Sequence, residues 1–306
     1  MKVLVTGASG FVGQHLLRNL LDNGHEIAIT APHPFTFSYK NKDHEGLIAD
    51  LSNPKDCESL VDKANPSAII HLAGMSHVQQ STEQRLEMAA GNISATLELF
   101  KAVYKTRKPC TIALASTAQM YKACGDHQET VVHENSEIEL TLPYALSKLA
   151  AEYIARSFED ENLKIYIIRP FNHIGPGQAK TFVCPGFAER IKSAKDGDTI
   201  PVGNLAAKRD FTDVRDVVDV YRLVIEKRPK EKLFVVGTGR AATIKEVLEY
   251  FIRLSGKTIH TTVDQALMRS MDPPSFRADP SLAKSVLGWQ PKYSLEQSLE
   301  DIYRSF

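Results

Sequence analysis

The chain has 306 residues, and its 37 lysine and arginine residues balance 37 aspartate and glutamate residues. This balance excludes the strong overall field that attracts a protein to nucleic acid or to a membrane surface, while a local basic patch for a phosphate-bearing ligand stays open. No run approaches the ~18 apolar residues of a membrane span. Lys2 leads directly into a strand-like segment rather than into a signal peptide.

Cysteine usage indicates a reducing compartment. The cysteines are scattered and form no C-x-x-C pair; they are Cys57, Cys110, Cys124 and Cys184. Such spacing favours free thiols over a disulfide framework or a zinc site. We therefore expect a soluble, cytoplasmic protein without a metal.

Short apolar runs alternate with longer segments of helical period up to residue 170. We expect strands over residues 2–5, 26–30, 68–72, 111–115 and 164–169. We expect helices over residues 14–23, 54–64, 83–104 and 144–160. Apolar strands that alternate with helices predict an α/β protein with a doubly wound parallel sheet, covered by helices on both faces.

The pattern changes after residue 169. Residues 172–186 are rich in glycine, proline and polar residues, which predicts a loop at a site rather than a core element. Beyond them we expect one strand and four helices, over residues 234–236 and over residues 185–195, 214–226, 243–255 and 294–303. The expected domains are residues 1–171 plus about 207–238, and a smaller, interleaved α/β lobe of residues 172–206 and 239–306.

The strongest local motif is T-G-x-x-G-x-x-G, which runs from Thr6 to Gly13 between a predicted strand and a predicted helix. Glycine lets the backbone turn tightly and approach a pyrophosphate, and the helix N-terminus adds unpaired amides and a positive dipole end. At this place in a βαβ unit the motif predicts a dinucleotide-binding loop. Its expected contact residues are Gly7, Ser9, Gly10, Phe11, Val12 and Gly13.

Two further segments follow predicted strands and are candidates for cofactor contacts. Asp50-Leu51 could place a carboxylate beside an adenine amino group; alternatively, Asp50 is a turn or N-cap residue before Pro54. Leu72-Ala73-Gly74 ends a buried strand with small residues that let a cofactor pass.

The end of the second strand lacks the acidic residue that often holds the ribose 2′-hydroxyl of NAD. Lys40 and Lys42, further on, could face a 2′-phosphate or could be solvated loop charges. We expect NADP or NAD as the cofactor, with NADP the favoured of the two.

A tyrosine and a lysine form the candidate catalytic pair. Tyr144 and Lys148 lie four residues apart on a predicted helix, so their side chains are neighbours on one face. An ammonium beside a phenol stabilises the phenolate and lowers a pKa that is normally near ~10. Surface decoration is the alternative for an isolated Y-x-x-x-K, but the preceding Pro143 and the glycine motif favour a site. Ser116 and Thr117, after the fourth strand, offer a hydroxyl to it.

Together these motifs resemble the extended short-chain dehydrogenase/reductase family, the NAD-dependent epimerases and dehydratases. The resemblance covers nearly the whole chain and includes Asn92-x-x-x-Thr96 and Arg169-Pro170. It implies a Rossmann-type fold, a nucleotide-sugar substrate and, commonly, a homodimer formed by the helices of residues 83–104 and 144–160. It also implies that Arg169 belongs to the cofactor site.

The resemblance implies a role for each catalytic residue. Tyr144 would exchange a proton with a sugar oxygen, and Lys148 would hold the nicotinamide ribose and bias the phenol. Thr117 takes the family's catalytic Ser/Thr position, counted back from Tyr121, and would hydrogen-bond the same sugar oxygen. The family's 4,6-dehydratases carry an acidic residue two places further on; here Gln119 has an amide that cannot titrate, which argues against a dehydratase.

Residues 169–178, and residues 202–204 followed by 208–217, closely resemble segments of GDP-4-dehydro-6-deoxy-D-mannose reductases. This resemblance implies that Asn172 and Arg209 contact the substrate, since an amide both donates and accepts and a guanidinium suits a diphosphate. Arg269 stands where these relatives carry arginine-rich nucleotide contacts, in a stretch that here is poor in arginine.

For four residues in this half of the chain, a structural role is the alternative or the expectation. An ion pair with Asp210 or Asp213 is the alternative for Arg209, and Asp213 could simply cap the helix that follows it. His173 is expected to be a positioned loop histidine, and Trp289 a core residue.

The resemblance thus implies NAD(P)H-dependent reduction of a 4-keto group, converting GDP-4-dehydro-6-deoxy-D-mannose to GDP-D-rhamnose. The alternatives are an NAD-dependent nucleotide-sugar 4-epimerase, a reductase of another nucleotide 4-keto sugar, and a cofactor-binding regulator without catalysis. The expected partner is a nucleotide sugar, with neither nucleic acid nor membrane.

Overall fold

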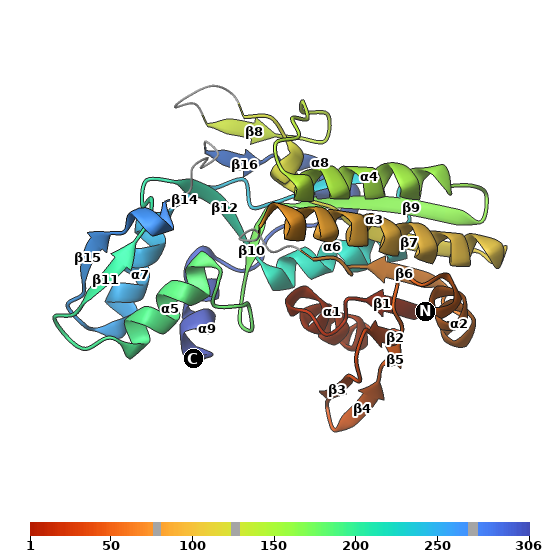
Figure 1. Cartoon of the computed structure of the whole chain (residues 1–306), viewed down its shortest axis with the longest axis horizontal. Helices are drawn as coiled ribbons and strands as arrows, with labels where there is room; N and C mark the ends of the chain where they lie inside the picture. Colours follow the sequence, from red (N-terminus) through yellow and green to blue (C-terminus); the bar gives the residue numbers. More distant parts are fainter. Residues whose placement is uncertain (76–80, 124–128, 269–274) are drawn as a thin grey trace.

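A parallel sheet of seven strands forms the centre of the larger domain (Figure 1). The computed structural model describes residues 1–75, 81–123, 129–268 and 275–306. The strands are β1 (Lys2–Thr6), β2 (Glu26–Ala31), β5 (Leu47–Ile48), β6 (Ala68–His71), β7 (Cys110–Ala115), β9 (Leu163–Pro170) and β13 (Leu233–Val236). Their order is β13-β9-β7-β6-β1-β2-β5, and all neighbours are parallel. The predicted doubly wound α/β sheet is confirmed.

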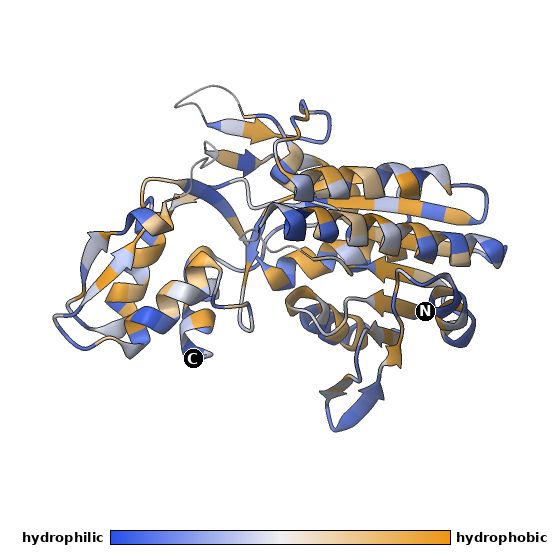
Figure 2. Cartoon of the chain, viewed as in Figure 1, coloured by the Kyte–Doolittle hydropathy of each residue, from blue (hydrophilic) through white to orange (hydrophobic). Residues whose placement is uncertain are grey.

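Helices cover both faces of this sheet. One face carries α1 (Phe11–Asp22), α6 (Val214–Lys227) and α8 (Ser281–Leu287), and the other carries α2 (Pro54–Ala64), α3 (Thr82–Lys105) and α4 (Pro143–Ser157). Within β1, Val3 and Val5 pack into the first of these cores while Leu4 packs into the second. Strands buried on both faces explain the solid apolar runs of the sequence, which are coloured orange in Figure 2.

The smaller lobe lies at the left of Figure 1 and has a core of its own. Its elements are α5 (Val183–Ser193), α7 (Ile244–Ser255), α9 (Leu295–Arg304) and the paired strands β11 (Thr199–Val202) and β15 (His260–Val263). A further small sheet has the order β10-β12-β16-β8, with β14 against β12. Its strands are β8 (Thr130–Val132), β10 (Asn172–Ile174), β12 (Lys208–Asp213), β14 (Ala241–Thr243) and β16 (Phe276–Ala278).

Helix ends follow the capping chemistry of the sequence. Thr243 and Glu246 form a capping box at the start of α7. Asp213 caps α6 by accepting a hydrogen bond from the backbone amide of Arg215, as the capping alternative predicted. None of the helices within the described ranges is long and apolar enough to cross a membrane.

The C-terminal part of the chain packs partly against the larger domain. The predicted domain boundaries place residues 281–289 in the smaller lobe. In the structure, Ala283 and Leu287 of α8 pack with α6 and β13 in the core of the larger domain. Trp289 joins them, 2% exposed, and its indole N–H donates to the backbone oxygen of Asp216 at 2.8 Å. The chain therefore returns from the smaller lobe to the larger domain before α9.

Lys257 closes the C-terminal end of α5. Its ammonium donates to the backbone oxygens of Ile191, Lys192 and Ala194 at 3.1, 2.9 and 2.6 Å. The last carbonyls of a helix have no partner within the helix, and the dipole favours a cation there. We expect Lys257→Met to lower the free energy of unfolding by about 1–3 kcal/mol, measured by urea denaturation.

A matched lysine variant controls for the loss of charge. Lys245 on α7 is exposed and makes a 3.7 Å ion pair with Glu249. Lys245→Met should change the free energy of unfolding by less than about 0.5 kcal/mol. Equal losses in the two variants would contradict the capping role of Lys257.

Candidate active site

The site forms where the strand order of the sheet reverses. β1 and β6 are neighbours in the sheet, and Thr6 pairs with His71 in their register. β2, which follows β1 in the chain, and β7, which follows β6, lie on opposite sides of this pair. Ligands of open α/β sheets bind outside the carboxyl ends of the strands at such a point. The loops after the two strands come into close contact there. A Cβ added to Gly7 would lie only 2.8 Å from the backbone nitrogen of Ala73.

The glycine loop leaves no room for side chains at two positions. Gly7 has a φ of +69°, in the left-handed region that favours glycine. A Cβ on Gly13 would come within 2.4 Å of the backbone oxygen of Gly7 and 2.6 Å of that of Ala8. The loop is thus folded tightly against the first turn of α1, as the T-G-x-x-G-x-x-G spacing predicts.

The first turn of α1 fits a pyrophosphate. Its N-cap is Gly10, which offers no side-chain hydrogen bond to the turn. No side chain therefore caps the backbone amides of Phe11, Val12 and Gly13, which lie at the positive end of the helix dipole. Ser9 immediately precedes the N-cap residue. Unpaired amides at a helix N-terminus bind phosphate groups. The loop predicted from the sequence accordingly has the geometry that a dinucleotide needs.

Asp50 is a turn residue in the structure. Its exposed carboxylate accepts hydrogen bonds from the amide and hydroxyl of Ser52 at 2.9 and 2.8 Å, which hold the pKa of the carboxyl below its usual range. The N-cap of α2 is Asn53, so Asp50 does not cap that helix. Leu51 packs against the core. The contact between Asp50 and adenine stays a prediction.

The lysines that favoured NADP lie away from the glycine loop. Lys40 joins β3 (Thr36–Tyr39) to β4 (Lys42–Glu45), a hairpin the sequence did not predict, and β4 is hydrophilic in Figure 2. The ammonium of Lys40 pairs with the carboxylate of Asp22 at 2.6 Å. Asp22 is the last of the 12 residues of α1, about 18 Å along the helix from the glycine loop. Lys40 therefore gives no reason to prefer NADP over NAD.

The predicted catalytic residues come together beside β7. Thr117 follows the end of that strand, and Tyr144 and Lys148 occupy the first two turns of α4. The ammonium of Lys148 lies 6.0 Å from the ring centroid of Tyr144 and donates to the backbone oxygen of Ala115 at 3.0 Å. Thr117 hydrogen-bonds the Tyr144 phenol. A phenol, a hydroxyl and an ammonium thus share one small site.

Burial sets the ionisation of this site. It raises the pKa of Tyr144 to about 12, and the hydrogen bond with Thr117 acts in the opposite direction. It lowers the pKa of Lys148 to about 8, and the carboxylate of Glu152 acts in the opposite direction. At neutral pH both groups are protonated. The phenol can therefore donate a proton, and the ammonium can stabilise the phenolate that remains.

Asn92 and Ser147 support the catalytic helix, a role that the sequence did not reveal. Asn92 accepts a hydrogen bond from the backbone amide after Gly74 at 2.8 Å and donates to the hydroxyl of Ser147 at 3.2 Å. That hydroxyl donates to the backbone oxygen of Tyr144 at 2.8 Å. A Cβ on Gly74 would lie 3.1 Å from the ammonium of Lys148, so the loop after β6 reaches the catalytic lysine.

Arg169 has internal hydrogen-bond partners, and its contact with the cofactor stays a prediction. Its side chain is 4% exposed, and two of its nitrogens donate to the carboxylate of Glu152 at 2.8 and 2.6 Å. A third donates to the hydroxyl of Tyr121 at 2.8 Å. A buried charge needs such partners, so the structure assigns Arg169 to a buried ion pair.

The predicted substrate residues lie on neighbouring strands of the small sheet. Asn172 is exposed on β10, and Arg209 is half-buried on β12, where its guanidinium donates to the backbone oxygen of Lys208 at 2.7 Å. Arg269 lies outside the described residues.

The acidic neighbours of Arg209 have other partners. The carboxylate of Asp210 accepts hydrogen bonds from the amides of Thr238, Gly239 and Ala278. Asp213 caps α6 and pairs with Arg215 at 2.7 Å. Both carboxylates therefore hold structural positions.

His173 connects the small sheet to the glycine loop. Its ring stacks on that of Phe11, with centroids 6.2 Å apart and planes at 7°. Burial lowers the pKa of His173, while a hydrogen bond with the backbone oxygen of Phe171 acts in the opposite direction. A neutral ring held in this way is the positioned loop histidine that the sequence predicts.

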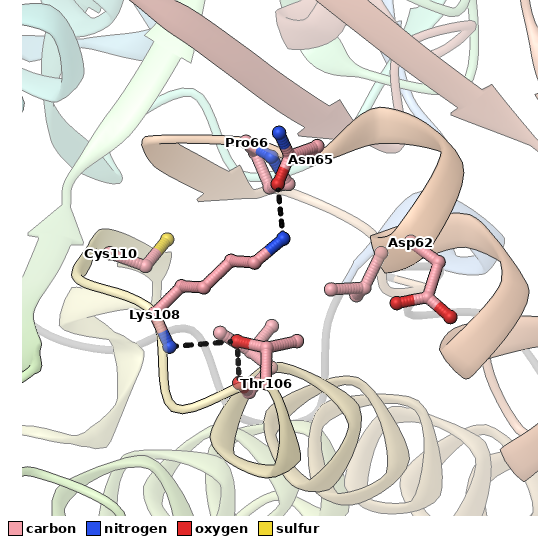
Figure 3. A pocket seen from close by; sticks show the side chains of 8 residues that line it. Asp62, Asn65, Pro66, Thr106, Lys108 and Cys110 are labelled. Atoms are coloured by element: carbon pink, nitrogen blue, oxygen red, sulfur yellow. Dashed lines mark hydrogen bonds between the residues drawn. The ribbon is translucent and has the colours of Figure 1, made fainter.

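A small pocket lies at the amino ends of the strands, near the beginnings of β6 and β7 (Figure 3). Its volume is about 10 Å³, room for one water, and Lys108 donates to the side-chain oxygen of Asn65 across it at 2.8 Å. It is far too small for a nucleotide sugar. Among the described residues, no group of three His, Cys, Asp or Glu side chains is arranged to hold a metal ion.

Comparison with known proteins decides the family. The family model described as GDP-mannose 4,6 dehydratase matches residues 4–302. The chain belongs to this family. Its members are NAD(P)-dependent enzymes of nucleotide sugars, and the resemblance predicted from the motifs is confirmed.

Relatives within the family include more than one activity. The chain is 29% identical to GDP-6-deoxy-D-mannose reductase of Pseudomonas aeruginosa, over 98% of the chain and 95% of the relative. It is 26% identical to UDP-glucose 4-epimerase of Pisum sativum, over 98% and 94%. Membership is therefore common to reductases and epimerases.

A solved structure supports the predicted cofactor. RMD from Pseudomonas aeruginosa, complexed with NADPH, has a TM-score of 0.85 and 28% identity, with 99% of this chain and 98% of that chain covered. The prediction that the cofactor is NADP or NAD is confirmed, without a preference between the two.

Proposed function

We propose that this enzyme reduces the 4-keto group of a GDP-4-keto-6-deoxy sugar with NAD(P)H, converting GDP-4-dehydro-6-deoxy-D-mannose to GDP-D-rhamnose. The observation that carries the proposal is the geometry of the Tyr144 phenol, which is hydrogen-bonded to Thr117 and has the Lys148 ammonium 6.0 Å from its ring centroid. Similarity to a GDP-6-deoxy-D-mannose reductase over 98% of the chain supports the choice of substrate. Gln119, exposed beside Thr117, supplies no carboxylate for a dehydration.

Bound NAD(P)H supplies the hydride that adds to the ketone carbon C4. The glycine loop holds the pyrophosphate through the amides at the start of α1. Thr117 donates a hydrogen bond to the ketone oxygen and polarises the carbonyl. Tyr144 gives its proton to the same oxygen as negative charge develops there.

Lys148 makes this proton transfer favourable. Its ammonium lies beside the ring of Tyr144 and stabilises the phenolate that forms when the proton leaves. It is held in place by the backbone oxygen of Ala115. The phenolate then regains a proton from solvent before the next turnover.

The substrate side of the site is assigned to three residues. We propose that Asn172 hydrogen-bonds the sugar and that Arg209 and Arg269 contact the nucleotide diphosphate. Asn172 on β10 and Arg209 on β12 belong to adjacent strands, so one ligand can reach both.

We also propose a homodimer formed by α3 and α4. These helices pack against each other and expose the apolar side chains of Leu86, Leu146 and Tyr153, at 58%, 51% and 68%. Burial of these side chains against a second copy would remove apolar surface from water.

Stoichiometry tests the proposed reaction. The keto sugar would be generated in place by a GDP-mannose 4,6-dehydratase, and NADPH and NADH oxidation would be followed separately by absorbance. We expect one equivalent of cofactor to be oxidised for each product sugar formed. Conversion of UDP-glucose to its 4-epimer without net change in cofactor would replace this proposal with the epimerase, which the 26% identical relative represents.

The pH dependence of reduction tests the state of Lys148. Its pKa is about 8, so the ammonium is present below that pH and is lost as the pH rises through it. We therefore expect kcat/KM for the keto sugar to fall as the pH rises above about 8, while Tyr144, with a pKa of about 12, stays protonated. A profile that is flat across this range would contradict the role of the ammonium.

A further inference from the structure

A buried carboxylate lies directly behind the catalytic lysine. Glu152 is 1% exposed and is held by the fork of Arg169, at 2.8 and 2.6 Å, and by the hydroxyl of Ser116. Arg156, on the same helix, approaches it at 3.8 Å from the solvent side. Removal of a charged pair from water is costly, so a pair at this depth calls for a reason beyond stability.

Two features of the structure place Glu152 close to Lys148. Glu152 follows Lys148 by four residues on α4, so the two side chains are neighbours on one helix face. The end of β7 links them again, because the Lys148 ammonium donates to the backbone oxygen of Ala115 and the next residue, Ser116, donates to Glu152. The lysine and the carboxylate are therefore held by consecutive residues of one strand end.

We propose that Glu152 is a positioning residue that keeps Lys148 charged and aimed at Tyr144, and that Arg169 and Ser116 fix Glu152 for this purpose. The proposal deepens the proposed function, because it rests on Lys148 acting as the ammonium of that reaction. Arg169, predicted from the sequence as a cofactor contact, thereby acts on the site from behind.

The other groups around Lys148 give it no negative charge. His71, from β6, is fully buried, and burial together with the charge of Lys148 lowers its pKa to about 3, so it is neutral. Tyr144 beside the lysine is a neutral phenol. Tyr221 of α6, which interacts with Tyr144, is also neutral, because burial raises its pKa well above the usual range. Arg169 is positive. Among the described groups that face the lysine, Glu152 is thus the anion that opposes the effect of burial on its pKa.

Glu152→Gln is the direct test, since it keeps the shape and removes the charge. Lysine labelled with ¹³C at the ε carbon would be followed by NMR against pH, with the Lys148 signal assigned by its absence in Lys148→Arg. We expect the pKa of Lys148 to fall by about one unit or more. The decline of kcat/KM with rising pH should move to lower pH by the same amount.

Two further variants keep the test decisive. Glu159→Gln removes a carboxylate that pairs with Lys232 at the surface, and it should leave both readouts unchanged. Glu152→Gln leaves Arg169 without its charged partner. The double variant Glu152→Met/Arg169→Met therefore replaces the whole ion pair with apolar residues, a change that proteins often tolerate at buried pairs. It too should lower the pKa of Lys148.

The possible outcomes are distinct. An unchanged pKa of Lys148 in either folded variant overturns the proposal, and so does failure of both variants to fold, which would leave the pair a purely structural role. The NMR titration needs no substrate. A lowered pKa in an enzyme that does not reduce the GDP-keto sugar would therefore support the role of Glu152 and reject only the substrate.

Discussion

Tyr144→Phe is expected to lower kcat for reduction by about 10²–10⁴-fold and to leave the Kd for NAD(P)H nearly unchanged. The substitution deletes the proton that goes to the sugar oxygen but keeps the ring against the Lys148 ammonium, 6.0 Å away. Stopped-flow or steady-state oxidation of the cofactor measures kcat, and quenching or transfer of protein fluorescence measures Kd.

Tyr153 offers a matched control on the same helix. Its side chain is 68% exposed in the single chain and lies on the face proposed for the dimer, so Tyr153→Phe removes a hydroxyl there and keeps the ring. This variant should retain kcat within about twofold. If Tyr144→Phe also kept its kcat, the proton would have to come from another group, and the catalytic assignment would be wrong.

Gly13→Ala is expected to abolish measurable cofactor binding and to lower the free energy of unfolding by about 1–3 kcal/mol. The added Cβ would lie 2.4 Å from the backbone oxygen of Gly7 and 2.7 Å from the Cα of Ala8. These are backbone atoms, so no side-chain rotation relieves the clash. The loop must open, and the amides at the start of α1 then lose their alignment toward the pyrophosphate.

Gly91→Ala is the control for the effect of a methyl group at a helical glycine. Gly91 lies within α3, and its added Cβ would meet only the end of the Met75 side chain, at 3.6 Å. Alanine in a helix interior should raise the free energy of unfolding by about 0.5–1 kcal/mol and leave cofactor binding intact. Titration of both variants with NADPH and NADH, with urea denaturation of each, would settle the comparison. Normal cofactor affinity in Gly13→Ala would contradict the assignment of the glycine loop.

The parts of the site that could be predicted from the sequence are local ones. The glycine loop depends on spacing within a single strand–turn–helix unit. The pairing of Tyr144 with Lys148 depends on the period of one helix. The strands of the central sheet other than β5, which has two residues, were predictable because burial on both faces requires continuous apolar runs. Each of these signals is contained within a short segment.

The missed features depend on residues that are distant in the chain. The ion pair of Arg169 was not predicted because its partner, Glu152, lies on another element, 17 residues away. Lys40 looked like a ligand of a 2′-phosphate because nothing in its own segment shows that the hairpin brings it to Asp22. The short strands of the small sheet, such as β10 and β16, carry too few residues for a period to be visible.

The helix α8 was not among the predicted helices, for a similar reason. Its seven residues are too few for a helical period to show in the sequence, and they do not reveal which core the segment joins. Its apolar residues pack against α6, about 60 residues earlier, and only tertiary packing makes that choice.

The fate of the hydride tests the central claim most directly. The GDP-keto sugar would be reduced with NADPH, or with NADH, that carries deuterium at the transferable position of the nicotinamide, and the product would be identified by NMR and mass spectrometry. We expect one deuterium at C4 of a GDP-6-deoxyhexose, GDP-D-rhamnose, with one cofactor oxidised for each sugar. A product without deuterium, or a 4-epimer formed with no net oxidation of the cofactor, would contradict it.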